Sequence, residues 1–179
     1  DWYRTQAYYN SGGWRATWDG EGGGVLLNQC PHNLDLLQWI CGLPCRVRAF
    51  CHNGKWHQIE VEDDVTAYLE FPNGATGVFV TTTADAPGTN RFEITLERGK
   101  LVAEHDKLTF FELEQSERDF CFMATGGFEQ PAGHEITIEL DGDEYMLTQM
   151  VKQLDKLIDI KKITYADEKS CIFRELCLV

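Results

Sequence analysis

The spacing of hydrophobic residues changes near residue 45. Between residues 25 and 41, in VLLNQCPHNLDLLQWIC, apolar side chains recur every three to four residues, as in an amphipathic helix. Gly42 and Pro44 follow as stop signals, and Pro31 must either kink this helix or stand in the first turn of one. From Cys45 the period shortens to two, which is typical of strands. We expect strands at 45–52, 64–71, 75–83, 91–97, 100–104, 107–114 and 134–140.

The breaks between these segments favour antiparallel pairing. Asn73-Gly74 is a strong hairpin signal, and Arg98-Gly99 separates two further strands by a short turn. Residues 1–24 are aromatic and glycine-rich and predict irregular structure, whereas 143–160 carry a second helical stripe. This order predicts an α+β fold, a largely antiparallel open-faced β-sheet with helices packed on one face, in a single domain over 1–179.

Charge and composition narrow the class of partner. The chain is 43% hydrophobic and carries a net charge of −13, and its first lysine is Lys55. It has no basic stripe to displace counterions from phosphates, which argues against nucleic acid and against an anionic membrane surface. No apolar run approaches the roughly 20 residues that span a bilayer. Neutral small molecules and protein surfaces are therefore the expected partners.

The cysteines and the first residues bear on the cellular compartment. The seven cysteines are an odd number and include no Cys-x-x-Cys, which favours free thiols in a reducing cytoplasm. The N-terminal residues show no basic region followed by an apolar stretch, so no secretory signal is visible. The first residue is Asp1 rather than Met, which suggests a piece of a longer protein.

One segment combines groups that could carry acid–base chemistry. On a continuous helix, Asn28, His32 and Asp35 would be spaced i, i+4 and i+7 and share one face, beside Gly22-Gly23-Gly24. An imidazole in such a place can take a proton from a hydroxyl near neutral pH. The alternative is that His32 only lines a polar helix face.

Other motifs are less convincing as sites. The glycine triplet is followed by no Lys-Ser/Thr and preceded by no strand, so it is not a P-loop. Cys30 and His32 are two residues apart and would not face each other on a helix. Glu62-Asp63-Asp64 is more typical of a solvated turn than of a cation site. A zinc site is disfavoured because no standard ligand spacing occurs among Cys41, Cys45, Cys51, His52 and His57.

The order of several motifs resembles a known family. They are Trp14-Arg15, Gly22-Gly23-Gly24, Asn28-x-x-x-His32-x-x-Asp35, Trp39-x-x-Gly42-x-Pro44, Glu62-Asp63-Asp64, Phe71-Pro72-Asn73-Gly74-Ala75, Pro87-Gly88-Thr89-Asn90-Arg91 and Glu97-Arg98-Gly99-Lys100-Leu101. Over about residues 1–140 this order is similar to the C-terminal domain of the Gfo/Idh/MocA oxidoreductases, which include inositol and glucose–fructose oxidoreductases. Together the motifs are far more specific than any one of them.

The resemblance implies half of a two-domain enzyme. The whole would be an NAD- or NADP-dependent oxidoreductase acting on a sugar, cyclitol or related polyol, with a dihydrodipicolinate-reductase-like C-terminal domain. The N-terminal Rossmann domain would hold the dinucleotide and supply a lysine from a Glu-Lys-Pro motif. This chain has neither that motif nor a Gly-x-Gly-x-x-Gly after a strand, so we expect it to bind no cofactor and to be inactive alone.

The resemblance also implies roles for individual residues. His32 would be the acid or base for the substrate hydroxyl. Asn28 stands where many members have an Asp, and its amide can orient substrate but cannot relay protons. Arg15, Trp14 and Asp35 would bind substrate. Their structural alternatives are an ion pair of Arg15 with Asp19 or Glu21, packing for Trp14 and a helix-orienting role for Asp35.

The resemblance also bears on the oligomeric state and on the C-terminal residues. The free sheet face would form a homodimer or homotetramer, and a non-catalytic binding or oligomerisation module with the same fold is the alternative function. Residues 150–179 depart from the usual ending of the family, either as a divergent helix and strand or as the product of an altered reading frame.

Overall fold

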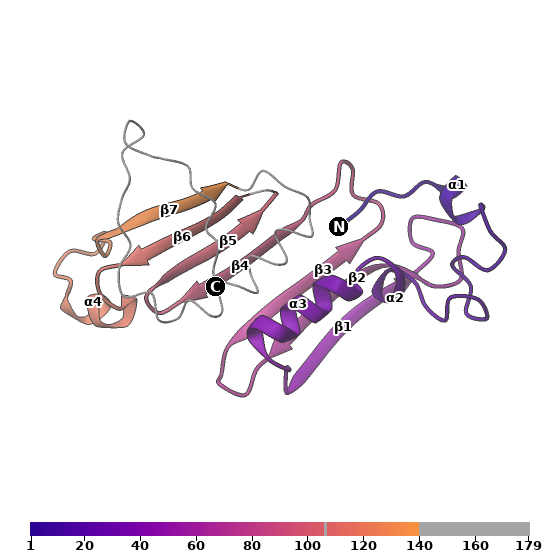
Figure 1. Ribbon diagram of the computed structural model, residues 1–179. Helices are drawn as coiled ribbons and strands as arrows, with labels where there is room; N and C mark the ends of the chain where they lie inside the picture. The colour runs from indigo at the N-terminus through magenta and orange to yellow at the C-terminus, as the bar shows by residue number, and fades with distance from the viewer. Residues whose placement is uncertain (106, 140–179) are drawn as a thin grey trace, which may run out of the picture.

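The computed structural model describes residues 1–105 and 107–139 (Figure 1). The helix predicted at 143–160 and the divergent residues 150–179 lie outside the described residues. The helices are α1 (Gln6–Tyr9), α2 (Val25–Asn28), α3 (Pro31–Cys41) and α4 (Glu117–Met123). The strands are β1 (Arg46–Asn53), β2 (Glu62–Glu70), β3 (Thr76–Thr82), β4 (Arg91–Leu96), β5 (Gly99–Glu104), β6 (Lys107–Leu113) and β7 (Gly133–Glu139).

All seven predicted strands are present, and the antiparallel α+β fold class is confirmed. The strands divide into two antiparallel sheets, β1-β2-β3 and β4-β5-β6-β7, each in sequence order (Figure 1). Alternation in the sequence predicts strands but does not specify this division. The Asn73-Gly74 hairpin joins β2 to β3, and Gly74 has the positive φ of 86° that such a turn requires.

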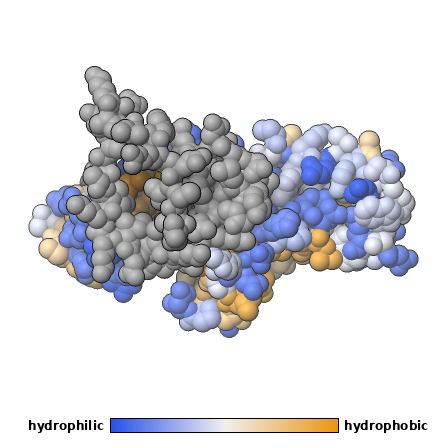
Figure 2. Space-filling model, viewed as in Figure 1, coloured by the Kyte–Doolittle hydropathy of each residue, from blue (hydrophilic) through white to orange (hydrophobic). Residues whose placement is uncertain are grey.

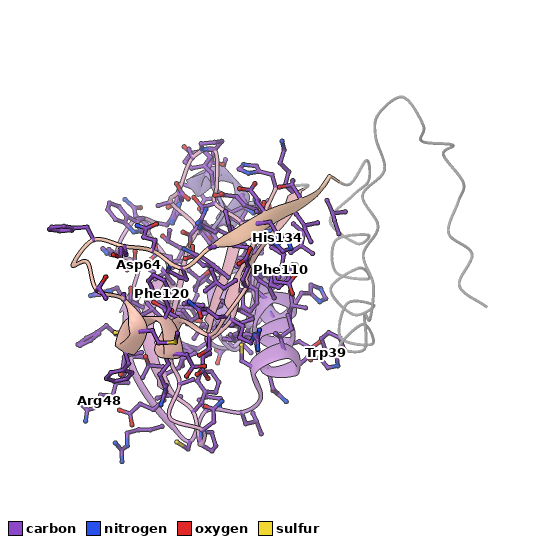
Figure 3. The ribbon with its side chains drawn as sticks, turned by 90° about the vertical axis from the view of Figure 1, so that its left-hand side faces the viewer. Trp39, Arg48, Asp64, Phe110, Phe120 and His134 are labelled. Atoms are coloured by element: carbon purple, nitrogen blue, oxygen red, sulfur yellow. The ribbon has the colours of Figure 1, made fainter. Side chains whose placement is uncertain are left out.

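The β1-β2-β3 sheet is covered by helix on one face and open on the other. Ala67, Leu69 and Phe71 are buried on the covered face, where Leu37 and Cys41 of α3 pack against them. The alternate residues of β2 point to the opposite, open face. Figure 3 shows Trp39 on the α3 side of the sheet and Arg48 on the other.

Pro31 was expected either to kink the helical run over 25–41 or to stand in the first turn of a helix, and the structure shows the second, because a separate helix begins at Pro31. α2 ends at Asn28, Cys30 has non-helical backbone angles, and α3 begins at Pro31. Proline has no N–H to donate and its ring collides with the preceding turn, so it is tolerated only where a helix starts. The predicted end is confirmed, since α3 stops at Cys41 and Gly42 has a φ of 78°.

The first residues of the chain are tied to the end of β3. Trp2 N donates to Thr82 O at 2.9 Å and Arg4 N to Thr83 O at 2.8 Å. Tyr9 packs with Ala16 and Val61 in a second small core, and its hydroxyl donates to Thr83 Oγ1 at 2.9 Å. These contacts hold the irregular N-terminal segment beside β2 and β3. Among the described residues, no helix is long and apolar enough to cross a membrane.

Candidate functional site

The glycine-rich loop is held against the start of β2 by a buried carboxylate. Glu62 Oε1 accepts hydrogen bonds from Gly24 N at 3.0 Å and from Leu26 N at 3.2 Å, at the beginning of α2. A Cβ on Gly24 would lie 1.9 Å from the Glu62 carbonyl oxygen, so only glycine permits this approach. The Gly22–Gly24 motif therefore serves to dock α2 on β2.

Glu21 connects two residues that the sequence singled out. Its Oε1 accepts a hydrogen bond from Asn28 Nδ2 and lies 4.0 Å from Arg15 Nη1. Its Oε2 accepts from Ala16 N at 2.7 Å. Arg15 and Asn28 are thus brought to one carboxylate, although 13 positions separate them in the sequence.

Arg15 is also surrounded by aromatic rings. Its guanidinium carbon lies 4.7 Å from the ring centroid of Tyr8 and 4.5 Å from that of Trp14, and Nη1 donates to the Tyr8 hydroxyl at 3.0 Å. Trp14 itself is half exposed. The predicted structural alternative for Arg15, an ion pair with Glu21, is therefore formed, and the guanidinium is held in place by stacking.

His32 lies in the first turn of α3 with its side chain exposed. Within the described residues, no hydrogen bond or ion pair of its ring is recorded, and the same holds for Asp35 three residues further along the helix. Because Pro31 separates α2 from α3, Asn28 is not on the same helical face as His32, which corrects the predicted i, i+4, i+7 arrangement. His32 and Asp35 do share α3.

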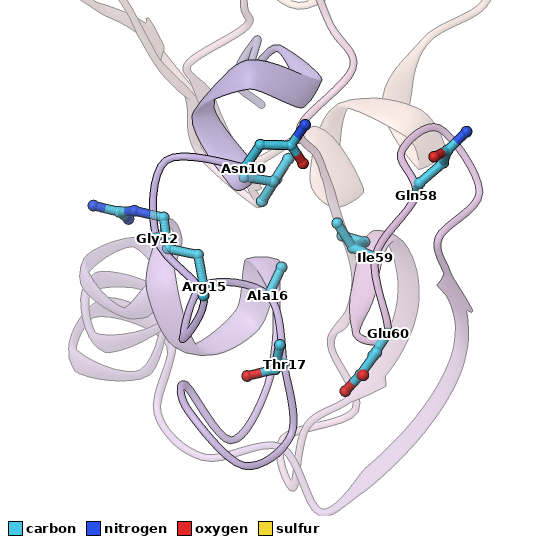
Figure 4. A pocket seen from close by; sticks show the side chains of 10 residues that line it. Asn10, Gly12, Arg15, Ala16, Thr17, Gln58, Ile59 and Glu60 are labelled. Carbon is cyan, nitrogen blue, oxygen red and sulfur yellow. The ribbon is translucent and has the colours of Figure 1, made fainter.

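A cavity of about 450 Å³ lies on another side of the N-terminal loop (Figure 4). Its wall is formed by residues 9, 10, 12, 13 and 15–17 of the N-terminal loop and by residues 58–60. Arg15 is the one predicted site residue in its wall, and its guanidinium extends away from Gln58 and Glu60 (Figure 4). The cavity therefore adjoins the group formed by Arg15, Glu21 and Asn28, and Arg15 belongs to both.

The reading of Glu62-Asp63-Asp64 as a solvated turn is wrong. The Asp63 side chain is 0% exposed and accepts three backbone hydrogen bonds, from Lys55, Trp56 and His57 at 2.9–3.0 Å. His57 Nδ1 also lies 3.0 Å from Asp63 Oδ2. A carboxylate can be buried when N–H donors replace its water, and the chain supplies them from the loop that precedes β2.

The two histidines considered for a zinc site are paired with aspartates. His52 and His57 each lie beside an aspartate, Asp64 and Asp63 respectively. In the described part of the chain, no three metal-binding side chains are grouped together.

Burial raises the pKa of the Cys30 thiol, which lies against the sheet and has no exposed surface. Cys30 is therefore a packing residue rather than a nucleophile.

Sequence reasoning placed Glu62 in a solvated turn and treated Glu21 only as an ion-pair partner for Arg15. Glu62 occupies the first position of a buried strand, and a carboxylate at such a position is itself a signal that donors are near. Glu21 lies in an irregular loop, where the sequence has no repeating pattern that could predict which side chains are in contact. Its role follows from the closure of that loop onto α2.

The described residues do not fit the pyrophosphate of a dinucleotide. The Gly24 and Leu26 amides at the start of α2 are already bonded to the Glu62 carboxylate, whose charge would repel a phosphate. No strand precedes the glycine triplet in the described chain. A nicotinamide dinucleotide would have to be held by residues other than these.

The model of the GFO/IDH/MocA C-terminal domain family matches residues 1–102. This is more than half of the chain, and the chain belongs to that oxidoreductase family. The antiparallel α+β architecture agrees with this membership.

Solved structures and curated proteins give further similarities. An apo levoglucosan dehydrogenase shares the fold with a TM-score of 0.60 at 17% identity, over 86% of this chain and 46% of that one. The WlbA dehydrogenase of Chromobacterium violaceum, solved with NADH and UDP-GlcNAcA, is 30% identical over 61% of this chain and 29% of its own, with a TM-score of 0.48.

Among curated proteins, a "probable acetolactate synthase small subunit" of Methanothermobacter thermautotrophicus is 39% identical over 57 residues, which is 32% of this chain. The chain spans 34% of the length of that relative and less than half of the solved dehydrogenase chains.

Proposed function

We propose that this chain is the substrate-binding half of an NAD(P)-dependent oxidoreductase that acts on a sugar, cyclitol or related polyol. The observation that carries the proposal is the exposed His32 in the first turn of α3, close in sequence to Asn28 at the end of α2, in a chain of this family. The similarity to levoglucosan dehydrogenase supports the fold. The substrate class rests on the resemblance of the motifs.

In this proposal His32 exchanges the proton of the substrate hydroxyl. Its ring is exposed and has no recorded partner among the described residues, so either nitrogen can meet a ligand. Asn28 orients the substrate, and Arg15, Trp14 and Asp35 bind it. The nicotinamide dinucleotide, NAD or NADP, is held by a separate Rossmann domain, since the amides of the glycine loop are occupied by Glu62.

The exposed apolar side chains on α2, on α3 and just after it are the proposed contact with that domain. Leu27, Trp39 and Leu43 are 60%, 43% and 66% exposed. Figure 2 shows apolar residues gathered along this side of the molecule, near α2 and α3. Exposed apolar side chains in such number are typical of a surface that another domain covers.

The test uses the protein that joins this chain to a nucleotide-binding domain. His32→Ala should lower kcat by about 10²- to 10⁴-fold, the usual contribution of a positioned acid or base, while NADH affinity stays within twofold. His134→Ala is the control, because His134 lies on β7 and pairs with Glu112. Equal kcat values for the two variants would reject the role of His32. Polyol turnover by the 179-residue chain alone would reject the proposal that a separate domain supplies the cofactor.

We also propose that the open face of the β1-β2-β3 sheet joins copies of the chain as a homodimer or homotetramer. Phe50, Val78 and Val80 are exposed on this face, at 71%, 68% and 52%, and Tyr68 lies between them. The same surface is the observation that favours the alternative function of a non-catalytic assembly module. The two functions are separated by the His32→Ala measurement.

Sedimentation velocity tests the assembly. Val78→Lys should shift the wild-type oligomer to monomer, because a charge replaces an apolar contact on the open face, beside Tyr68 of the central strand. Val47→Lys is the matched control, since Val47 is also exposed on a strand but pairs with Leu69 on the covered face. A wild-type chain that sediments as a monomer would contradict the proposal.

A further inference from the structure

The Glu21 carboxylate lies where three parts of the candidate site meet. Ala16 N donates to one oxygen at 2.7 Å, and Asn28 Nδ2 donates to the other. Arg15 Nη1 approaches that second oxygen at 4.0 Å. The Glu21 side chain is only 9% exposed, so these donors replace most of its water.

This arrangement fixes the orientation of the Asn28 amide. An ionised carboxylate accepts hydrogen bonds and cannot donate them, so the NH₂ end of Asn28 must face Glu21. The Oδ1 end then faces away, where Gln29 Nε2 reaches it at 3.1 Å. A carbonyl oxygen has two lone pairs, so Asn28 Oδ1 can accept a second hydrogen bond, from a ligand hydroxyl.

The same carboxylate lies beside Arg15, and the rings of Tyr8 and Trp14 also restrain the guanidinium. Nη1 is directed to the Tyr8 hydroxyl, and a guanidinium has further N–H groups that only donate. Asn28 therefore offers an acceptor and Arg15 offers donors, and both lie next to Glu21. Two adjacent hydroxyl groups match this pair, one as donor and the other as acceptor.

The geometry points to Glu21 as a positioning residue that sets the hydrogen-bond polarity of the substrate site, so that Asn28 accepts and Arg15 donates to neighbouring hydroxyls of one polyol. This inference rests on the proposed function, which gives the ligand class. It adds that the site selects vicinal diols through a residue that does not touch the substrate itself.

The first measurement needs no ligand. In ¹⁵N-edited spectra of the 179-residue chain, Glu21→Gln should move the Asn28 side-chain NH₂ signals, which an Asn28→Asp sample assigns. Glu21→Asp keeps a carboxylate and should leave the signals closer to wild type. Glu60→Gln is the matched control, because Glu60 is exposed and its carboxylate accepts one backbone hydrogen bond, from Trp18 N rather than from Asn28.

The second measurement titrates the same samples with myo-inositol and with 1,3-propanediol, which has no vicinal hydroxyls. We expect myo-inositol to bind wild type and Glu60→Gln alike, Glu21→Gln about tenfold more weakly, and Glu21→Asp in between, with unchanged melting temperatures. Tight inositol binding by Glu21→Gln, or equal binding of both diols by wild type, overturns the role of Glu21. A wild-type chain that binds no inositol counts against the proposed function, and unmoved Asn28 signals in Glu21→Gln then reject the Glu21 inference separately.

Discussion

His57 Nδ1 lies 3.0 Å from Asp63 Oδ2, and the other ring nitrogen of His57 lies 2.9 Å from Arg4 O. The imidazole therefore links the loop between β1 and β2 to the N-terminal segment. Both partners are hydrogen-bond acceptors, and the tautomer of the ring decides which nitrogen donates. The His57 ring also packs against Tyr9, with ring centroids 4.8 Å apart.

Asp63→Asn should destabilise the chain by about 2–4 kcal/mol, because it turns an amide donor toward a group of N–H donors in a buried place. Urea unfolding followed by tryptophan fluorescence measures the loss. Asp19→Asn is the control, an exposed position expected to change stability by no more than ~0.5 kcal/mol. Similar losses for the two variants would show that Asp63 does not organise the loop.

Gly24→Ala should cost at least about 3 kcal/mol or prevent folding, because the added methyl would collide with the Glu62 backbone. The control is Gly13→Ala, where a Cβ meets no atom within 4 Å, and its effect should stay near zero. The melting temperatures of the two variants, compared with that of wild type, measure the two effects. A Gly24→Ala protein that melts like the control would mean that the loop does not approach β2 so closely.

Asp64 should give the chain a stability that depends on acid pH. Partial burial raises the pKa of its carboxyl, but hydrogen bonds from Lys55 and Trp56 and the charge of Lys55 outweigh burial, so the pKa is lowered overall. A lowered pKa in the folded state contributes stability above the pKa of an unfolded Asp, about 3.9, and this contribution is lost as the pH falls through the folded value.

The measurement compares wild type with Asp64→Asn in urea at pH values from neutral to strongly acidic. Wild type should be the more stable at neutral pH, and the gap should close below the ordinary pKa of an aspartate. Trp56→Phe removes one donor and should move the NMR-detected pKa of Asp64 upward. A gap that widens in acid would contradict the direction of the shift.

Cys30 should be the slowest of the described cysteines to react with a thiol reagent, because it is fully buried and burial raises its pKa. Cys45 and Cys51 are exposed and should label within the first minutes. Peptide mass spectrometry separates the positions. Rapid labelling of Cys30 in the native chain, matching its rate in urea, would mean that the junction between α2 and α3 does not pack against the sheet.

The sequence predicted the strands well because several of them, β2 and β3 above all, alternate between buried and exposed residues, and alternation is a local pattern. Val65, Ala67 and Leu69 all point to the covered side of β2, as their spacing predicted. The apolar period over 25–41 runs on through Pro31, so the sequence left two outcomes open, a kinked helix or a helix that starts at the proline. The choice between a kink and a new start depended on backbone geometry at Cys30 that no periodicity contains. α4 is short and was not predicted; Ser116 caps its N-terminus through Asp119 N.

The candidate site was predicted only in part. His32, Asn28 and Arg15 were named from residue type and from the family order of motifs. Glu21 and Glu62 were not given their roles, because each acts through contacts between segments that are distant in sequence or irregular. Such contacts depend on how the loops close, and the spacing of hydrophobic residues carries no information about loop closure.

The anchoring of the N-terminal segment has a consequence for the order of folding. Asp1 Oδ1 accepts a hydrogen bond from Thr82 N, which lies 81 positions later in the sequence. Gly24 N donates to the Glu62 carboxylate, which lies 38 positions later. Contacts across such spans close large loops and form slowly. On the ribosome, residues 1–24 therefore leave the exit tunnel long before β2 and β3 exist to receive them. Residues 1–24 therefore wait for partners that are synthesised after them, and chaperone contact is expected to fall there.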